Sequence, residues 1–151
     1  MNLFGRVFRF ISESRARTLS LEAAARRLEA SGPALAARMG AASPTPRTLE
    51  QARHIIGIER WGQARLRRLL GGPIANDEYD SYRPNDLAAL PALADAFAAT
   101  RAETVALVRA LRQAGKTGDE TAAHNELGEL SILGWVVYLD DHAIRESHLI
   151  R

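Results

Sequence analysis

We expect the fold to be organised around the segment at residues 135–151, which reads WVVYLDDHAIRESHLIR. Its apolar and aromatic side chains recur every three or four positions, as on one face of an α-helix. The same face carries an imidazole and a carboxylate. Because burying an ionisable pair without partners costs several kcal/mol, we expect the rest of the chain to supply either a hydrogen-bonded ion partner or a metal ion. The face comprises Trp135, Leu139, His142, Glu146 and Leu149.

Length and composition favour a single helical domain over residues 1–151. A chain of 151 residues, 46% of them hydrophobic, is long enough to bury one core. Ala, Leu, Arg and Glu are abundant and runs of β-branched residues are scarce, so we predict an all-α protein. The net charge is only +2 and both signs are interleaved, so the sequence contains no concentrated basic patch. We therefore expect no nucleic-acid partner.

The chain contains no cysteine, so any thiol chemistry must come from a second molecule. This suits a reducing compartment, and no apolar run reaches the roughly 18 residues of a membrane span. We therefore expect a soluble, cytoplasmic protein with no membrane partner. Residues 1–17 are basic and amphipathic, and we predict that they form a short helix docked on the fold, with a membrane-surface or targeting segment as the alternative. The predicted apolar face of this helix comprises Leu3, Phe4, Val7, Phe8 and Ile11.

Four longer helical patterns follow this segment. Gly32-Pro33 interrupts the first, where we expect a kink or a fresh start because proline removes a backbone donor. The second opens on a capping-box signature, Thr48-x-x-Gln51. The predicted helices run from Thr18 or Ser20 to Gly40, from Thr48 to Gly71, from Asp86 or Pro91 to Gly115, and from a Ser131 cap to the C-terminal region.

Two long polar connections, residues 74–85 and 115–129, separate the last three helices. Four helices joined in this way predict a bundle, and facing helices in bundles build metal sites. His54, near the edge of the apolar arc of the second helix, is the natural partner of His142 and Glu146. Two histidines and one carboxylate are typical of catalytic zinc and non-haem iron centres. Alternatively, His142 and Glu146 form an ordinary helical pair and His54 is a hydrogen-bonded structural residue.

Five motifs occur in order between residues 19 and 151: HIIGIERW at 54–61, YRP at 82–84, Phe97-x-x-x-Arg101, HNELGELSILGW at 124–135 and YLDDHAIRE at 138–146. In this order they resemble the DinB-like family, which includes YfiT-type metal-dependent hydrolases. The resemblance implies a four-helix bundle with up-down-down-up connectivity and a divalent metal held by three histidines. One of these is matched by His54, and the other two form an H-x-x-x-H on the last helix, where this chain has His142 and Glu146. Glutamate can ligate zinc, nickel, manganese or iron, but the substitution is equally expected of a site that has lost its metal.

The resemblance implies an enzyme for a small-molecule substrate, either a metal-dependent hydrolase or a thiol-dependent S-transferase with a low-molecular-weight thiol as a further cofactor. The alternative is a non-catalytic, stress-linked bundle or binding protein with a degenerate metal site. Four residues are candidates for the pocket. Trp61, Trp135 and Tyr138 either pack the core or form an aromatic wall beside the metal, and His124 either borders the mouth of the site or caps a loop.

Three further expectations concern polar residues. We expect Arg101 to be a buried or half-buried ion partner of Glu59, and His148 to lie on the surface. We expect Asp140 and Asp141 to be either solvated or acceptors for the ligand residues, rather than ligands themselves. The chain is expected to be a monomer or a small homo-oligomer such as a homodimer.

Overall fold

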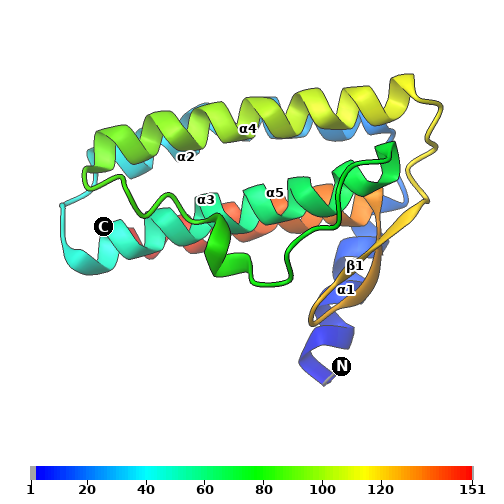
Figure 1. Cartoon of the computed structure of the whole chain (residues 1–151), viewed down its shortest axis with the longest axis horizontal. Coiled ribbons are helices and arrows are strands. Elements are labelled where there is room, and N and C mark those ends of the chain that lie inside the picture. The colour runs from blue at the N-terminus through cyan, green and yellow to red at the C-terminus, as the bar shows by residue number, and fades with distance from the viewer. Residues whose placement is uncertain (1–2, 151) are drawn as a thin grey trace.

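A computed structural model of the chain describes residues 3–150, with side chains from residue 7 onward (Figure 1). This part is mostly helical, so the prediction of an all-α class is confirmed at that level. It also contains a short antiparallel hairpin in which Thr121 lies opposite Ser131, and this hairpin was not predicted. The elements are α1 (Leu3–Ala16), α2 (Leu21–Ala41), α3 (Pro46–Arg67), η1 (Arg68–Leu70), η2 (Tyr79–Tyr82), α4 (Leu90–Gln113), β1 (Thr121–His124), β2 (Gly128–Ser131) and α5 (Ile132–Ser147).

The four long helices form a bundle, with α2 beside α4 in the upper part of Figure 1 and α3 beside α5 below them. The colour ramp runs from left to right along both α3 and α4, and from right to left along α2 and α5. Helices α3 and α4 are therefore parallel, and the connection between them must return along the bundle. The structure accordingly places residues 71–89 across the side of α3, where η2 packs against that helix.

Several helix ends follow the predicted capping chemistry. Ser131 caps α5 by accepting from the backbone N–H of Gly134 at 2.9 Å, as predicted. Pro91 lies in the first turn of α4. Backbone N–H groups in the first turn have no acceptor within the helix, so a proline there removes no hydrogen bond. The Thr48-x-x-Gln51 prediction is wrong, because α3 starts three residues earlier with Thr45 as the cap and Thr48 as its reciprocal partner. A threonine hydroxyl thus replaces the glutamine side chain of the usual signature.

Of the two alternatives expected at Gly32-Pro33, a kink or a fresh start, the fresh start is wrong, because α2 runs without a break from Leu21 to Ala41. Pro33 is exposed, whereas Gly32 is buried against the aliphatic part of Arg101 on α4. A Cβ at position 32 would lie 3.1 Å from the Cγ of Arg101. Packing of α2 on α4 therefore outweighs the local cost of the proline.

Helix α1 packs against α5 and β2. Its Glu13 carboxylate accepts from the backbone N–H of Ser131 at 2.8 Å and from the Ser131 hydroxyl at 2.9 Å, so it supports the start of α5. The predicted docking face is wrong in part, because Val7 and Ile11 are exposed while Ser12 and Ala16 are buried. The side chains of residues 3 and 4, also assigned to that face, lie outside the described residues.

The core consists of two hydrophobic clusters with a buried polar network between them. The predicted pair is confirmed: the Nη2 of Arg101 donates to Glu59 at 2.9 Å, and both side chains are almost completely buried. The Nη1 of Arg101 donates to Asp140 at 2.9 Å, and Asp140 also accepts from Arg27 and Ser31. Asp140 is only 1% exposed, so the expectation that it is solvated or bound to a ligand histidine is wrong.

The apolar face predicted for residues 135–149 is wrong at its last member, Leu149, which lies beyond the end of α5. Leu149 is 45% exposed, whereas Ile150 is buried, because the helix ends at Ser147 and the chain turns there. His148 is exposed, as predicted, beside the guanidinium of Arg38. None of the helices within residues 3–150 combines the length and apolarity needed to cross a membrane.

Candidate functional site

A cavity of about 250 Å³ lies between α3 and α5, where η2 and the turn of the hairpin approach the bundle. Six side chains singled out from the sequence line this cavity: His54, Trp61, His124, Tyr138, His142 and Glu146. Trp135 lies behind the wall, since its Nε1 donates to the carbonyl of Ala122 at 2.9 Å. The sequence-based candidates therefore gather at one place in the fold, although they come from three separate segments.

His54 and His142 face each other across the interface of α3 with α5. Their ring centroids are 5.2 Å apart. Burial, with contributions from His54 and Arg145, lowers the pKa of His142 to about 3. Burial and the nearby Arg83 also lower the pKa of His54 below its ordinary value. Both imidazoles are consequently neutral at neutral pH, which is the form that ligates metals.

The hydrogen bond on His54 determines which of its nitrogens carries the proton. The Nη2 of Arg83 lies 3.2 Å from the Nδ1 of His54. A guanidinium can only donate, so Nδ1 accepts and the neutral ring holds its proton on Nε2. Arg83 is in turn held by Glu50 and Asp80. Binding of a cation at Nε2 would require Arg83 to move away and the proton to leave that nitrogen.

Glu146 lines the same cavity, but donors hold both of its oxygens. Gln51 donates to Oε2 at 2.8 Å, and the Nε of Arg145 donates to Oε1 at 3.0 Å. Among the side chains that the structure describes, no group of three or more histidines, aspartates or glutamates is arranged to hold a metal ion. The structure thus brings two of the three predicted ligands together and leaves the third engaged elsewhere.

Aromatic rings form the wall of the cavity on the side of the hairpin. The ring of His124 lies edge to face with Tyr138 at 4.7 Å and with Trp61 at 4.9 Å between centroids. Burial raises the pKa of the Tyr138 hydroxyl. Sequence reasoning missed Tyr79 of η2, which contacts both His54 and Trp61. Its position in a long ordered connection was the available signal.

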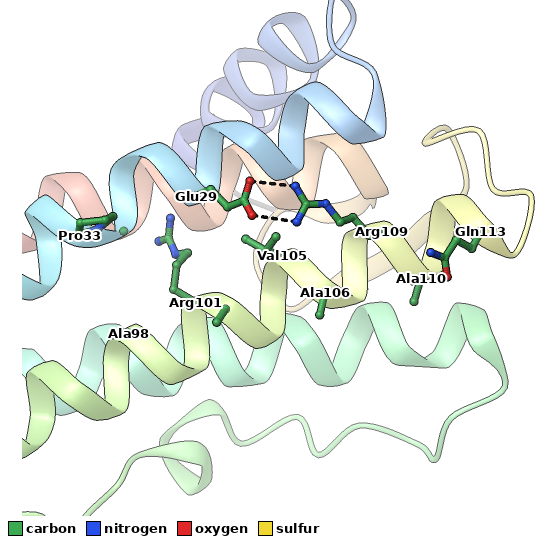
Figure 2. Close-up of a pocket in the computed structure, with 11 residues that line it drawn as sticks. Glu29, Pro33, Ala98, Arg101, Val105, Ala106, Arg109, Ala110 and Gln113 are labelled. Carbon is green, nitrogen blue, oxygen red and sulfur yellow. Dashed lines mark hydrogen bonds and ion pairs between the residues drawn. The ribbon is translucent and has the colours of Figure 1, made fainter.

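A larger hollow, of about 670 Å³, lies between α2 and α4 (Figure 2). Small side chains of α4 line it, and Arg109 closes one part of it by donating to both oxygens of Glu29 at 2.8 Å. Arg101 reaches its wall, but its guanidinium is already bound to Glu59 and Asp140. We place the candidate site in the smaller cavity because neutral imidazoles converge there, whereas the charged groups that line the larger hollow are already paired with one another or with the core.

Comparison of the chain with the known protein families, with curated proteins and with solved structures finds no match. A family assignment therefore depends on the motifs of the chain itself. Its function has to be argued from the geometry of the cavity.

Proposed function

We propose that this chain is a DinB-like four-helix bundle that binds one divalent cation in the cavity between α3 and α5. The observation that carries the proposal is a pair of neutral imidazoles, those of the half-buried His54 and the buried His142, whose centroids are 5.2 Å apart. Parallel α3 and α4 also support it, because up-down-down-up connectivity requires the two middle helices to run the same way. The HIIGIERW and YLDDHAIRE motifs lie on α3 and α5, on either side of the cavity.

The residues that would hold the cation are His54, His142 and Glu146. This donor set fits zinc, nickel, manganese or iron in chemical type. For the cation to bind, Glu146 would have to exchange its bonds with Gln51 and Arg145 for the cation, and Arg83 would have to leave the ring of His54. Neither change involves a residue of the hydrophobic clusters, since Arg145 is half exposed and Arg83 comes from the connection between helices.

A cation with three protein ligands would supply an open position at which a water or a thiolate becomes a nucleophile near neutral pH. The proposed reaction is therefore a hydrolysis or an S-transfer from a low-molecular-weight thiol, because the chain has no thiol of its own. The aromatic wall of Trp61 and Tyr138 would hold an apolar part of the substrate and exclude water. Arg145 at the cavity would contact a negatively charged group.

The test is metal loading of protein purified without a metal-affinity column. Chelator-treated protein is incubated with Zn²⁺, Ni²⁺, Mn²⁺ or Fe²⁺, passed through a desalting column and analysed for its elements. We expect close to one cation per chain for at least one of these metals, and its loss in His142→Ala. His148→Ala is the matched control, because His148 is exposed and lies outside the cavity. Equally negligible metal in the wild type and in His142→Ala would refute the proposal.

A second candidate is a non-catalytic, stress-linked binding protein with a degenerate metal site. It is favoured by the donors on Glu146 and by the Arg83 contact with His54, which together stabilise the cavity without a cation. The variant Glu146→His separates the two candidates, since it completes the H-x-x-x-H pattern. A degenerate site should gain metal in this variant while the wild type binds none. If the first proposal is right, the wild type should bind the cation without this substitution.

A further inference from the structure

The hairpin fixes the orientation and the tautomer of His124, the last residue of β1. Its Nδ1 accepts from the backbone N–H groups of Glu126 and Leu127, at 3.1 and 3.2 Å. Backbone amides can only donate, so Nδ1 carries no proton and the neutral ring holds one on Nε2. Burial, together with the charge of Arg65, lowers the pKa of His124 to about 4. The ring is therefore neutral at pH 7, and its Nε2–H group is a permanent donor.

This donor has no hydrogen-bond partner among the described residues. The Nε2 atom of His124 is buried, and the whole side chain is only 8% exposed. Because Nδ1 is held at the turn, Nε2 lies on the side of the ring away from those two amides, and the ring makes edge-to-face contacts with Trp61 and Tyr138. Edge-to-face contacts with these rings recover only part of the stabilisation that a hydrogen bond to Nε2–H would give.

A second unpartnered donor lies on the same wall. The Nε1 atom of Trp61 is buried and has no hydrogen-bond partner among the described residues, although its ring is only 1% exposed. A buried donor without a partner has lost its hydrogen bonds to water without a replacement, so two of them on neighbouring rings are unusual in a core. The centroids of the two rings are 4.9 Å apart, and both residues line the cavity between α3 and α5.

We infer that His124 and Trp61 form a binding subsite for an oxygen atom, in which their N–H groups donate to the carbonyl oxygen of a small ligand with a flat apolar body. The cavity, of about 250 Å³, exceeds the roughly 150 Å³ that admits benzene, so an aromatic ring with a carbonyl substituent fits. This inference deepens the proposed function and rests on it for the use of this cavity, because it names the substrate class as small aryl carbonyl compounds. Neither donor depends on a bound cation.

The test compares acetophenone with ethylbenzene, two probes of similar shape that differ in the carbonyl oxygen. Binding to metal-free, full-length protein is measured by calorimetry or ligand-observed NMR. Apolar burial alone favours ethylbenzene, which is the less polar probe. One neutral hydrogen bond contributes about 1 kcal/mol, so we expect acetophenone to bind roughly fivefold more tightly.

His124→Asn is the informative variant. Its side-chain oxygen can accept from Glu126 and Leu127 as Nδ1 does, so the turn keeps its hydrogen bonds while the distal donor is lost. We expect this variant to lose the preference for acetophenone, and the control His148→Asn to keep it. Nitrogen-15 NMR of wild-type imidazoles gives a readout that needs no variant: the Nε2–H signal of His124 should shift with acetophenone and not with ethylbenzene.

In the wild type, three results would overturn the inference: binding of neither probe, a preference for ethylbenzene, or an Nε2–H signal that responds equally to both probes. A His124→Asn variant that retains the wild-type preference would do the same. Failure of the metal proposal is measured separately, by elemental analysis. If the protein binds no cation but prefers acetophenone through His124, the metal proposal is refuted and the inference about the oxygen subsite is supported.

Discussion

Replacing Arg101 by methionine should be among the most destabilising single changes in this bundle. The guanidinium is the shared partner of two carboxylates that are each 1% exposed, Glu59 and Asp140, and it also donates to Ser31. Methionine retains an aliphatic stem that can pack against Gly32, so the variant removes the charge with little loss of volume. Glu59 then loses its cation, while Asp140 keeps Arg27.

The magnitude follows from burial. Removing one partner of a buried ion pair costs about 3–5 kcal/mol, because an uncompensated charge stays in the core. For a chain of this size, that loss lowers the melting temperature by roughly 6–20 °C. Burial already raises the pKa of the Glu59 carboxyl, and loss of Arg101 should raise it further. Protonation of Glu59 then removes the unpaired buried charge from the variant. The difference in the free energy of unfolding between variant and wild type should therefore become smaller as the pH falls.

The assay is urea unfolding followed by circular dichroism, at pH 7.5 and pH 5.5. Arg109→Met is the matched control, because Arg109 lies two turns further along α4 and also binds carboxylates, but at the surface. We expect only a small effect there, since exposed ion pairs are screened by water and salt. Two results would refute this reasoning: equal losses of stability in Arg101→Met and Arg109→Met, or a difference in stability from wild type that increases at pH 5.5. Either would show that the cost of losing Arg101 does not come from leaving a buried charge unpaired.

Two further predictions concern the cavity and the contact of α3 with α5. Metal-free protein should lose stability as the pH falls from about 6.5 towards 4, because folding lowers the pKa of His124 to about 4 and that of His142 to about 3, and the unfolded chain therefore binds more protons. Each histidine contributes up to about 1.4 kcal/mol per pH unit, so His124→Asn should flatten the dependence measured by urea unfolding, and an unchanged slope would contradict this. Gly62→Ala should destabilise the bundle by about 1–3 kcal/mol, because the added Cβ would lie 2.8 Å from a methyl group of Leu139. Gly40→Ala, where the nearest side-chain atom is 3.4 Å away, is its control in thermal unfolding and should be neutral or stabilising.

Local signals predicted the helices well and their exact starts less well. Apolar periodicity is a property of neighbouring residues, so it identified four long helices and the Ser131 cap. The start of α3 was missed because two threonines share the capping role that a glutamine usually has. The hairpin was missed because strands of four residues are too short for alternation to distinguish them from a loop.

The residues that line the candidate cavity were predictable only in part, and the contacts that they make were not predictable. His54, His142 and Glu146 could be singled out because an imidazole or a carboxylate conflicts with an apolar helical face. Their actual partners come from other segments: Arg83 from the connection before α4, and Gln51 from the first turns of α3. Such contacts depend on side-chain positions across the bundle, which no spacing within one helix encodes.

The helical class, the Ser131 cap and the set of residues that conflict with an apolar core could be predicted from the sequence alone, because each of these depends on neighbours along the chain. The tertiary structure alone decided that α3 meets α5 with His54 level with His142, and that Arg101 serves both Glu59 and Asp140. It also decided the tautomer of His124, because the hairpin turn brings two backbone donors to one nitrogen. The physical reason is that hydrogen bonding and burial depend on distances in space, whereas the sequence specifies only separations along the chain.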